Sequence, residues 1–211
     1  MSDLFTVTTA ATDLALLSLA ELRRATGAAD GQEADLVTLG ARVAAVIARA
    51  CKIAADGATA PTLRLETVAD TFELDYSRPD LILSRRPIIS VVSVVENGVT
   101  LTADDYRADA GAGLLRRRLD GRSWSWPPCF EIVVSYAAGW ATVPEDLKLA
   151  AAKTATMIWA ESGPSPRDPN LKRVRTEGID EVEYWVPPAS DSLLSAEILD
   201  LLRPYTNETI G

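Results

Sequence analysis

Histidine is absent from this sequence of 211 residues, and cysteine occurs only twice. The absence of histidine excludes Ser-His and Cys-His nucleophile pairs and every metal site that needs an imidazole ligand. Cys51 and Cys129 are far apart in the sequence, which favours two reduced, buried thiols over a disulfide or a catalytic cysteine. Gly111-Ala112-Gly113 lacks the lysine and the Ser/Thr of a phosphate-binding loop. We therefore expect no catalytic residue, no cofactor and no metal.

Long apolar runs and an excess of positive charge are also missing. No segment has about 18 consecutive apolar residues, and the acidic N-terminus lacks the basic start of a secretory signal. We expect neither a membrane association nor a secretory signal. Lysine and arginine number 21 against 30 acidic residues, giving a formal net charge of -9. This charge argues against nonspecific coating of nucleic acid, although a local basic patch could still contact it.

Two capped helices are predicted after a Thr/Ala-rich arm of residues 1–17. Ser18 and Glu21 have the spacing of a capping box, and the helix that they begin ends near Gly27. A second helix is predicted from about residue 33 to Ala54. Its many alanines and Gly40 permit close approach of another helix, within the chain or from a second subunit. Its apolar stripe consists of Leu36, Leu39, Val43, Val46, Ile47, Ala50 and Ile53.

A β-rich segment is predicted between residues 62 and 138. Residues 62–75 partly alternate, which predicts one long or two short strands. Asn97-Gly98 is a strong hairpin signal because both positions tolerate positive φ. Asp104 and Asp105 are adjacent, so they point to opposite faces of an extended segment and favour a turn or helix cap over an acid–base pair. Further strands are predicted at Ile88–Val95, Val99–Leu101, Leu114–Leu119 and Ile132–Tyr136.

Another helix is predicted where Thr142–Glu145 combines a Thr cap, an early proline and a glutamate at the third helical position. It should end near Glu161, with an inner face of Leu147, Ala150, Ala151, Thr154, Met157 and Ile158. Ser192–Leu202 can form a short amphipathic helix before an extended tail. The predicted class is α+β. A helical body of residues 18–55 and 142–163 carries an inserted antiparallel β domain of residues 62–138, and residues 164–211 form a C-terminal extension.

The densest basic cluster is Arg116, Arg117, Arg118 and Arg122. On a strand, Arg116 and Arg118 share one face and Arg117 takes the other. The cluster fits a solubilising strand edge, pairing with carboxylates of a partner protein, or contact with DNA phosphates. The sequence leaves these three interpretations open.

Aromatic residues concentrate in the loop that contains Trp124, Trp126 and Phe130. Such a loop suits a sugar-binding platform, a small core under the hairpins, or a protein contact, since tryptophan is enriched at interface hot spots. The same question arises for aromatic residues nearer the C-terminus. We select as candidate partner-interface residues Arg116, Arg118, Arg122, Trp124, Trp126, Tyr184, Trp185, Leu199, Leu202 and Tyr205.

The order of these elements resembles the head–tail connector, or adaptor, proteins of long-tailed bacteriophages and of phage-like gene transfer agents. The matching pieces are SLAELRRATGAA, EADLVTLGARVAAVIARACK, RRPIISVVSV with its NG turn, LTADDY, GAGLL, and VVSYAAG followed by VPEDLKLAAAKTA. They cover roughly residues 18–162. The Trp124–Phe130 loop and residues 172–185 have no counterpart in this pattern.

The resemblance implies a structural protein without enzymatic activity. Family members typically form a ring of twelve copies beneath the portal protein in the neck of the particle, so it implies assembly in the bacterial cytoplasm and a place in that neck. DNA would pass through the central channel without sequence-specific binding, and stopper, neck or tail proteins would attach to the ring. The helix and tail from Ser192 onward would dock on the portal. A carbohydrate- or surface-binding module that uses the Trp-rich loop is the alternative.

Overall fold

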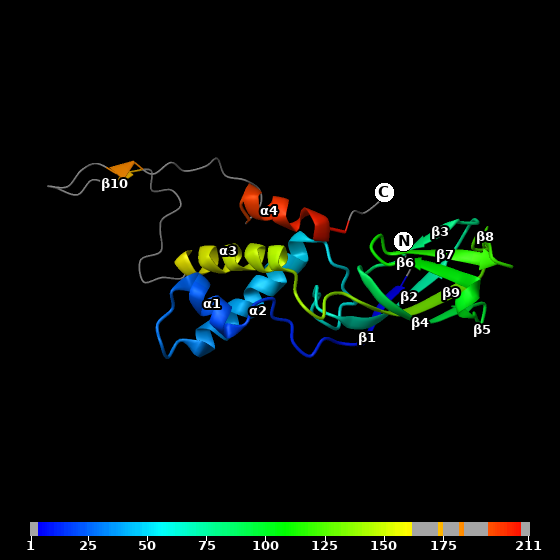
Figure 1. Cartoon of the computed structure of the whole chain (residues 1–211), viewed down its shortest axis with the longest axis horizontal. Helices are drawn as coiled ribbons and strands as arrows, with labels where there is room; N and C mark the ends of the chain where they lie inside the picture. Colours follow the sequence, from blue (N-terminus) through cyan, green and yellow to red (C-terminus); the bar gives the residue numbers. More distant parts are fainter. Residues whose placement is uncertain (1–3, 162–172, 175–181, 184–193, 208–211) are drawn as a thin grey trace. The chain divides into compact units, whose positions relative to one another are not determined.

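The computed structural model describes residues 4–161, 173–174, 182–183 and 194–207, which fall into two compact units. The β unit contains the described residues of 1–14, 44–144 and 205–211, and the helical unit contains those of 15–43 and 145–204. Figure 1 shows the strands of the first unit and the helices of the second. The α+β class predicted from the sequence is confirmed.

The β unit is built from two antiparallel sheets. The larger has the strand order β1-β2-β9-β4-β5, and the smaller has the order β3-β7-β6 with β8 paired to β7. The strands of the larger sheet are β1 (Leu4–Thr9), β2 (Glu66–Glu73), β9 (Glu131–Ala138), β4 (Ile88–Glu96) and β5 (Val99–Thr100). Those of the smaller sheet are β3 (Asp80–Ile82), β7 (Leu114–Leu119), β6 (Tyr106–Asp109) and β8 (Arg122–Trp124).

The core of the β unit draws side chains from both sheets. Alternate residues of β2 and β9 point inward, so each strand presents a buried row and a more exposed row. Burying each large apolar side chain contributes about 1.5–3 kcal/mol. The buried cluster comprises Val68, Phe72, Leu74, Leu81, Leu83, Ile88, Val94, Leu115, Trp126, Ile132, Val134, Tyr136 and Ala138.

Several predicted strands and turns are confirmed. β7 has the predicted bounds, and Asn97 and Gly98 adopt φ of 48° and 78° in the turn between β4 and β5. Asp105 caps a single 3-10 turn, η1 (Ala103–Asp105), by accepting hydrogen bonds from the backbone N–H and hydroxyl of Thr102. The predicted capping role therefore applies to Asp105.

The N-terminal residues differ from the loosely held arm that was expected. Leu4–Thr9 form strand β1, which pairs antiparallel with β2 at the edge of the larger sheet. The Val7 N–H donates to the carboxylate of Asp56, and the Ala11 N–H donates to Glu66. These contacts come from residues about fifty positions away in the sequence, which is why the local composition does not reveal them.

The helical unit contains α1 (Leu19–Thr26), the first part of α2 (Glu33–Ala50), α3 (Glu145–Glu161) and α4 (Ala196–Leu202). Thr156 of α3 donates to the Ala25 carbonyl of α1, and Lys153 of α3 pairs with Glu197 of α4 at 2.7 Å. A 3-10 turn, η2 (Arg203–Tyr205), follows α4, and the short strands β10 (Arg173–Val174) and β11 (Val182–Glu183) pair with each other.

Two predicted helix boundaries are wrong. α2 ends at Ala50 instead of Ala54, because Lys52 adopts φ of 53° and Ile53 donates back to the Ala48 carbonyl, which closes the helix as a Schellman motif does. α3 begins at Glu145, so Pro144 directly precedes it and Thr142 is not its cap. The Glu145 carboxylate pairs with Lys148 at 2.9 Å and does not reach back to form a capping box.

The predicted inner face of α3 is largely confirmed. Leu147, Ala150, Ala151 and Thr154 are buried, as is Ala155, whereas Met157 and Ile158 are half-buried. In α2, Gly40 faces Leu22 of α1, and a Cβ at Gly40 would lie 3.1 Å from the Leu22 side chain. The close approach that Gly40 permits is therefore used within the chain.

The predicted capping box of α1 is present, and it lowers the pKa of the carboxyl group of Glu21. Glu21 accepts from the backbone N–H and the hydroxyl of Ser18, and these bonds, with help from Lys148, lower its pKa from 4.5 to about 2. A depressed pKa stabilises the fold above pH 4.5, and this contribution is lost as the pH falls through about 2.

We expect Glu21→Ala to lower the free energy of unfolding at pH 7 by about 0.5–1 kcal/mol, because one half of the box is removed. The difference from the wild type should shrink as the pH falls from 4.5 towards 2, measured by urea unfolding across that range. Ser18→Ala, which removes the other half, is the matched variant. A difference that stayed constant with pH would contradict the role given to the Glu21 charge.

Candidate partner-binding surface

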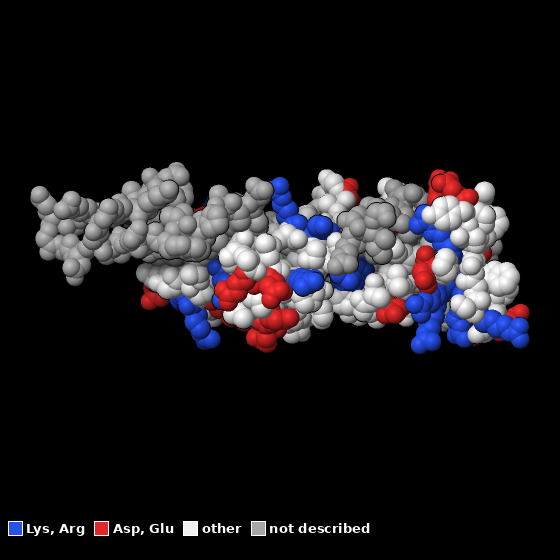
Figure 2. Space-filling view, turned by 90° about the horizontal axis from the view of Figure 1, so that it is seen from above, with Lys and Arg blue, Asp and Glu red and all other residues white. Residues whose placement is uncertain are grey.

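The candidate surface lies on the hairpin of β7 and β8. Asp120 and Gly121 form its turn with φ of 49° and 76°, as the two-residue Asp-Gly signal favours. The hairpin register places Leu119 opposite Arg122 and Arg117 opposite Trp124. In Figure 2, blue Lys and Arg atoms gather over the strands in the right-hand part of the view, with red acidic atoms among them.

Arg117 faces the inside of the β unit, while Arg116 and Arg118 share the outer face of β7, as predicted. The Arg117 side chain is only 11% exposed and binds Glu96 at 2.8 Å, with Asp105 3.6 Å away. Its guanidinium group also lies over the Trp126 ring. Arg117 therefore has an internal structural role.

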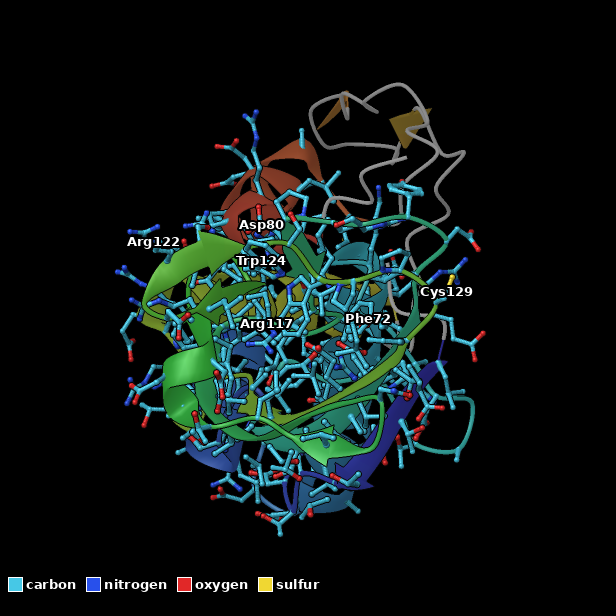
Figure 3. The ribbon with its side chains drawn as sticks, turned by 90° about the vertical axis from the view of Figure 1, so that its right-hand side faces the viewer. Phe72, Asp80, Arg117, Arg122, Trp124 and Cys129 are labelled. Atoms are coloured by element: carbon cyan, nitrogen blue, oxygen red, sulfur yellow. The ribbon has the colours of Figure 1, made fainter. Side chains whose placement is uncertain are left out.

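The other three arginines of the hairpin are less fully paired. Arg116 forms an ion pair with Asp80 at 2.9 Å, and Arg118 donates to the Gly121 carbonyl. Arg122 is exposed and has no ion-pair partner among the residues that the structure describes. In Figure 3, Arg122 lies at the outer rim of β8, whereas Arg117 lies toward the middle of the unit. The exposed guanidinium groups are thus available to a partner.

The two tryptophans of the loop have different environments. Trp126 is 0% exposed and donates its indole N–H to the Leu115 carbonyl at 3.1 Å, so it belongs to the core and its selection as an interface residue is corrected. Trp124 is 57% exposed. The loop therefore presents Trp124 and Phe130 but not Trp126, which removes one of the three aromatic residues of the suggested sugar-binding platform. We call Arg116, Arg118, Arg122 and Trp124 the hairpin surface. The register places Arg116 and Arg118 on one face of the hairpin, and Arg122 and Trp124 on the other.

The C-terminal candidates are also divided. Leu199 is 38% exposed on α4, whereas Leu202 is 1% exposed and is buried within the chain. The Tyr205 ring packs edge-on against Trp140, with ring centres 6.0 Å apart. The burial of Leu202 corrects its assignment as a partner contact, whereas the half-buried Tyr205 stays a candidate. Tyr184 and Trp185 lie outside the described residues.

Residues 206 and 207 are held on the β unit instead of forming a free extended tail. Arg86 donates to the Thr206 carbonyl, the Asn207 side chain donates to the Ser84 carbonyl, and the Asn207 N–H donates to the Cys51 carbonyl.

Burial raises the pKa of the Cys51 thiol to about 11, so this cysteine is a poor nucleophile. Cys129 is exposed, contrary to the expectation of two buried thiols, because it lies in the turn after Pro127-Pro128.

A buried polar network in the β unit was not foreseen. The fully buried Asp70 carboxylate accepts from the Ser84 N–H and hydroxyl at 2.7 Å and from the Tyr136 hydroxyl at 2.8 Å. Desolvation, together with the Asp70 charge, raises the pKa of Tyr136. Arg85 pairs with Glu66 at 3.3 Å, yet desolvation outweighs the pairing and raises the pKa of Glu66. These bonds fix the loop at residues 84–86, although the buried Nε of Arg85 has no hydrogen-bond partner among the described residues.

Metal-binding clusters and membrane-spanning helices are both absent from the described part of the chain. No group of three or more cysteine, aspartate or glutamate side chains there is arranged to hold a metal ion. None of the described helices is both long enough and apolar enough to cross a membrane.

No protein-family model matches the sequence, and no curated protein matches it. Solved structures do match across nearly the whole chain. One is a chain in "Neck of empty GTA particle computed with C6 symmetry", with 18% identity, a TM-score of 0.55 and coverage of 99% of this chain and 98% of that one. A chain in "Virion of native gene transfer agent (GTA) particle" has 16% identity, a TM-score of 0.56 and coverage of 98% and 97%.

A third match is a chain in "Neck of native GTA particle computed with C12 symmetry", with 17% identity, a TM-score of 0.55 and coverage of 99% and 98%. At these levels of identity the likeness concerns the fold. It extends over both the helical and the β-rich segments, because almost no part of either chain is left unmatched. The chain therefore shares its fold with chains of gene transfer agent particles.

Proposed function

We propose that this chain is a structural component of the neck of a phage-like particle, where it acts as a head–tail connector subunit. The observation that carries the proposal is the fold likeness over 99% of this chain and 98% of a chain from a gene transfer agent neck. Because the likeness spans nearly all of both chains, it favours a similar role for the whole molecule over a single domain shared between proteins of different function. Such a role requires shape and contacts, and no catalytic group.

The proposed assembly is a homo-oligomeric ring, with twelve copies as the working number. The two neck structures were computed with C6 and C12 symmetry, and both symmetries are compatible with a twelve-membered ring. The proposed partners are the portal protein on one side and a stopper, neck or tail protein on the other, with DNA passing through the centre. A net charge of -9 suits a channel protein that must not retain DNA.

The direct test combines the purified protein with capsids that carry the portal and images the result by electron microscopy. We expect closed rings on the portal vertex, with symmetry measured from the averaged images. Single copies scattered over the capsid, or no binding at all, would contradict the proposal. The same images of the protein alone establish whether the ring needs its partner to form.

Trp124→Ala tests the hairpin surface within this proposal. We expect at least about a tenfold loss of affinity for a neighbouring copy or for the capsid vertex, since exposed tryptophans at interfaces carry much of the binding energy. The free energy of unfolding should change by less than about 0.5 kcal/mol, because the ring is largely exposed. Leu149→Ala, another exposed apolar side chain but on α3, is the control. Unchanged affinity of the Trp124 variant would remove Trp124 from the interface.

A further inference from the structure

The outer face of the smaller sheet brings three arginines together from two strands. Arg107 on β6 lies directly opposite Arg116 on β7, and Arg118 follows two residues along the same face. On the other side of Arg116, β3 contributes Asp80. We call Arg107, Arg116 and Arg118 the arginine face. Arg107 had not been singled out from the sequence, because its position opposite Arg116 depends on the register of the strands.

The charges of the arginine face are not balanced within the described part of the chain. Asp80 pairs with Arg116, and the Arg118 side chain donates to the carbonyl of Gly121. The Arg107 side chain has no ion pair or hydrogen bond among the described residues. Like charges directly opposite each other on neighbouring strands are destabilising. The fold therefore retains two like charges directly opposite each other, of which only Arg116 has a carboxylate partner in the described part of the chain.

The surroundings of the arginine face favour a protein partner over DNA. The next cross-strand row of the same face contains the exposed Ile82, the half-buried Leu114 and the exposed Asp109. Arginines beside apolar side chains are typical of protein interfaces, whose centres are more apolar than their rims. Asp80 and Asp109 would repel phosphates, and the net charge of -9 opposes the approach of DNA.

We propose that the arginine face receives carboxylates from a second copy of this chain. This inference rests on the proposed function, since a ring is made of heterologous contacts in which two different patches of the same chain meet. A second copy offers the complementary charge, because the chain has 30 acidic residues against 21 basic ones. Asp35 on α2 and Asp200 on α4 are exposed, and their side chains have no basic partner among the described residues. A carboxylate bound between Arg107 and Arg116 removes the repulsion between them.

This arrangement predicts opposite effects on stability and on assembly. R107E places a negative charge opposite Arg116, so the melting temperature of the isolated chain should rise. The same substitution removes a donor for the neighbouring copy, so self-association should fall. Substitution of a residue with only a structural role would change the melting temperature and self-association in the same direction. A fall in the melting temperature together with a fall in association would overturn the inference.

The test measures self-association of the full chain by sedimentation at low and high salt. We expect the wild type to associate more weakly at high salt, and R107E/R118E to raise the dissociation constant roughly tenfold to a hundredfold at low salt. R24E/R42E, which makes the same change of net charge on exposed helical arginines, is the control and should not weaken association. An equal loss in the control would assign the effect to net charge and overturn the inference.

Electron microscopy of the same variants separates this inference from the proposed function. If the wild type and R107E/R118E form the same rings, the inference about the arginine face is overturned and the proposed ring still stands. A wild type that forms no ring, alone or on capsids, would overturn both. A gel-shift experiment with duplex DNA tests the alternative that the arginine face binds phosphates. Wild-type DNA binding that R107E/R118E abolishes, with self-association unchanged, would assign the face to phosphates instead.

Discussion

Trp126→Ala should lower the free energy of unfolding by about 3–5 kcal/mol. Trp126 is fully buried in the core of the β unit, and its indole N–H donates to the Leu115 carbonyl. Truncation leaves a large cavity beneath β7 and removes the ring over which the Arg117 guanidinium group lies. Because small domains are stable by only about 5–15 kcal/mol, this single change should remove much of the total.

The measurement is urea unfolding followed by circular dichroism, which does not depend on the fluorescence of the deleted ring. Trp124→Ala is the matched control, because it removes the same side chain two residues away at an exposed position. We expect its midpoint to stay close to that of the wild type. Similar losses for the two variants would contradict the difference in burial between these tryptophans.

Gly139→Ala should destabilise the fold by about 2–6 kcal/mol, combining backbone strain with a steric clash. Gly139 follows β9 with φ of +100°, and a Cβ there would lie 2.4 Å from the Arg64 carbonyl oxygen. The Gly139 N–H also donates to the Pro87 carbonyl, and Trp140 exchanges backbone hydrogen bonds with residues 63 and 65. The crowded atoms are backbone atoms of neighbouring segments, so they have little room to move.

Gly57→Ala is the control that separates strain from clash. Gly57 also has a positive φ, of +81°, but an added Cβ would meet nothing within 4 Å. We expect a loss of about 1 kcal/mol for Gly57→Ala, from the backbone conformation alone. The difference between the two variants, measured by thermal or urea unfolding, gives the cost of the clash. Equal effects would show that the space around Gly139 is less restricted than the distances indicate.

Local signals in the sequence predicted the elements whose structure depends on near neighbours. The Ser18–Glu21 box, the Asn97-Gly98 turn and the bounds of β7 all follow from residues within a few positions of one another. The alternation of Arg116, Arg117 and Arg118 between two faces needed only the period of a strand. These features are confirmed because no distant part of the chain changes them.

Features that depend on distant residues were missed or assigned wrongly. β1 exists because β2, about sixty residues away, offers it an edge. Trp124 and Trp126 belong to one short motif, and only the packing of the two sheets buries one and exposes the other. Arg107 belongs to none of the motifs recognised in the sequence, and only the strand register places it opposite Arg116. Lys52 ends α2 in a conformation that usually belongs to glycine, so no residue signalled the boundary.

The anchoring of Tyr205–Asn207 on the β unit affects when this chain can complete its folding during synthesis. The unit begins with strand β1 at Leu4. It is closed when Arg86 donates to the Thr206 carbonyl and Asn207 donates to the carbonyls of residues 84 and 51. Those bonds cannot form until residue 207 has left the ribosome. Contacts of such long sequence separation also form slowly. A nascent chain therefore has an unfinished β unit, and each subunit reaches its final fold only after translation has passed its last anchoring residue.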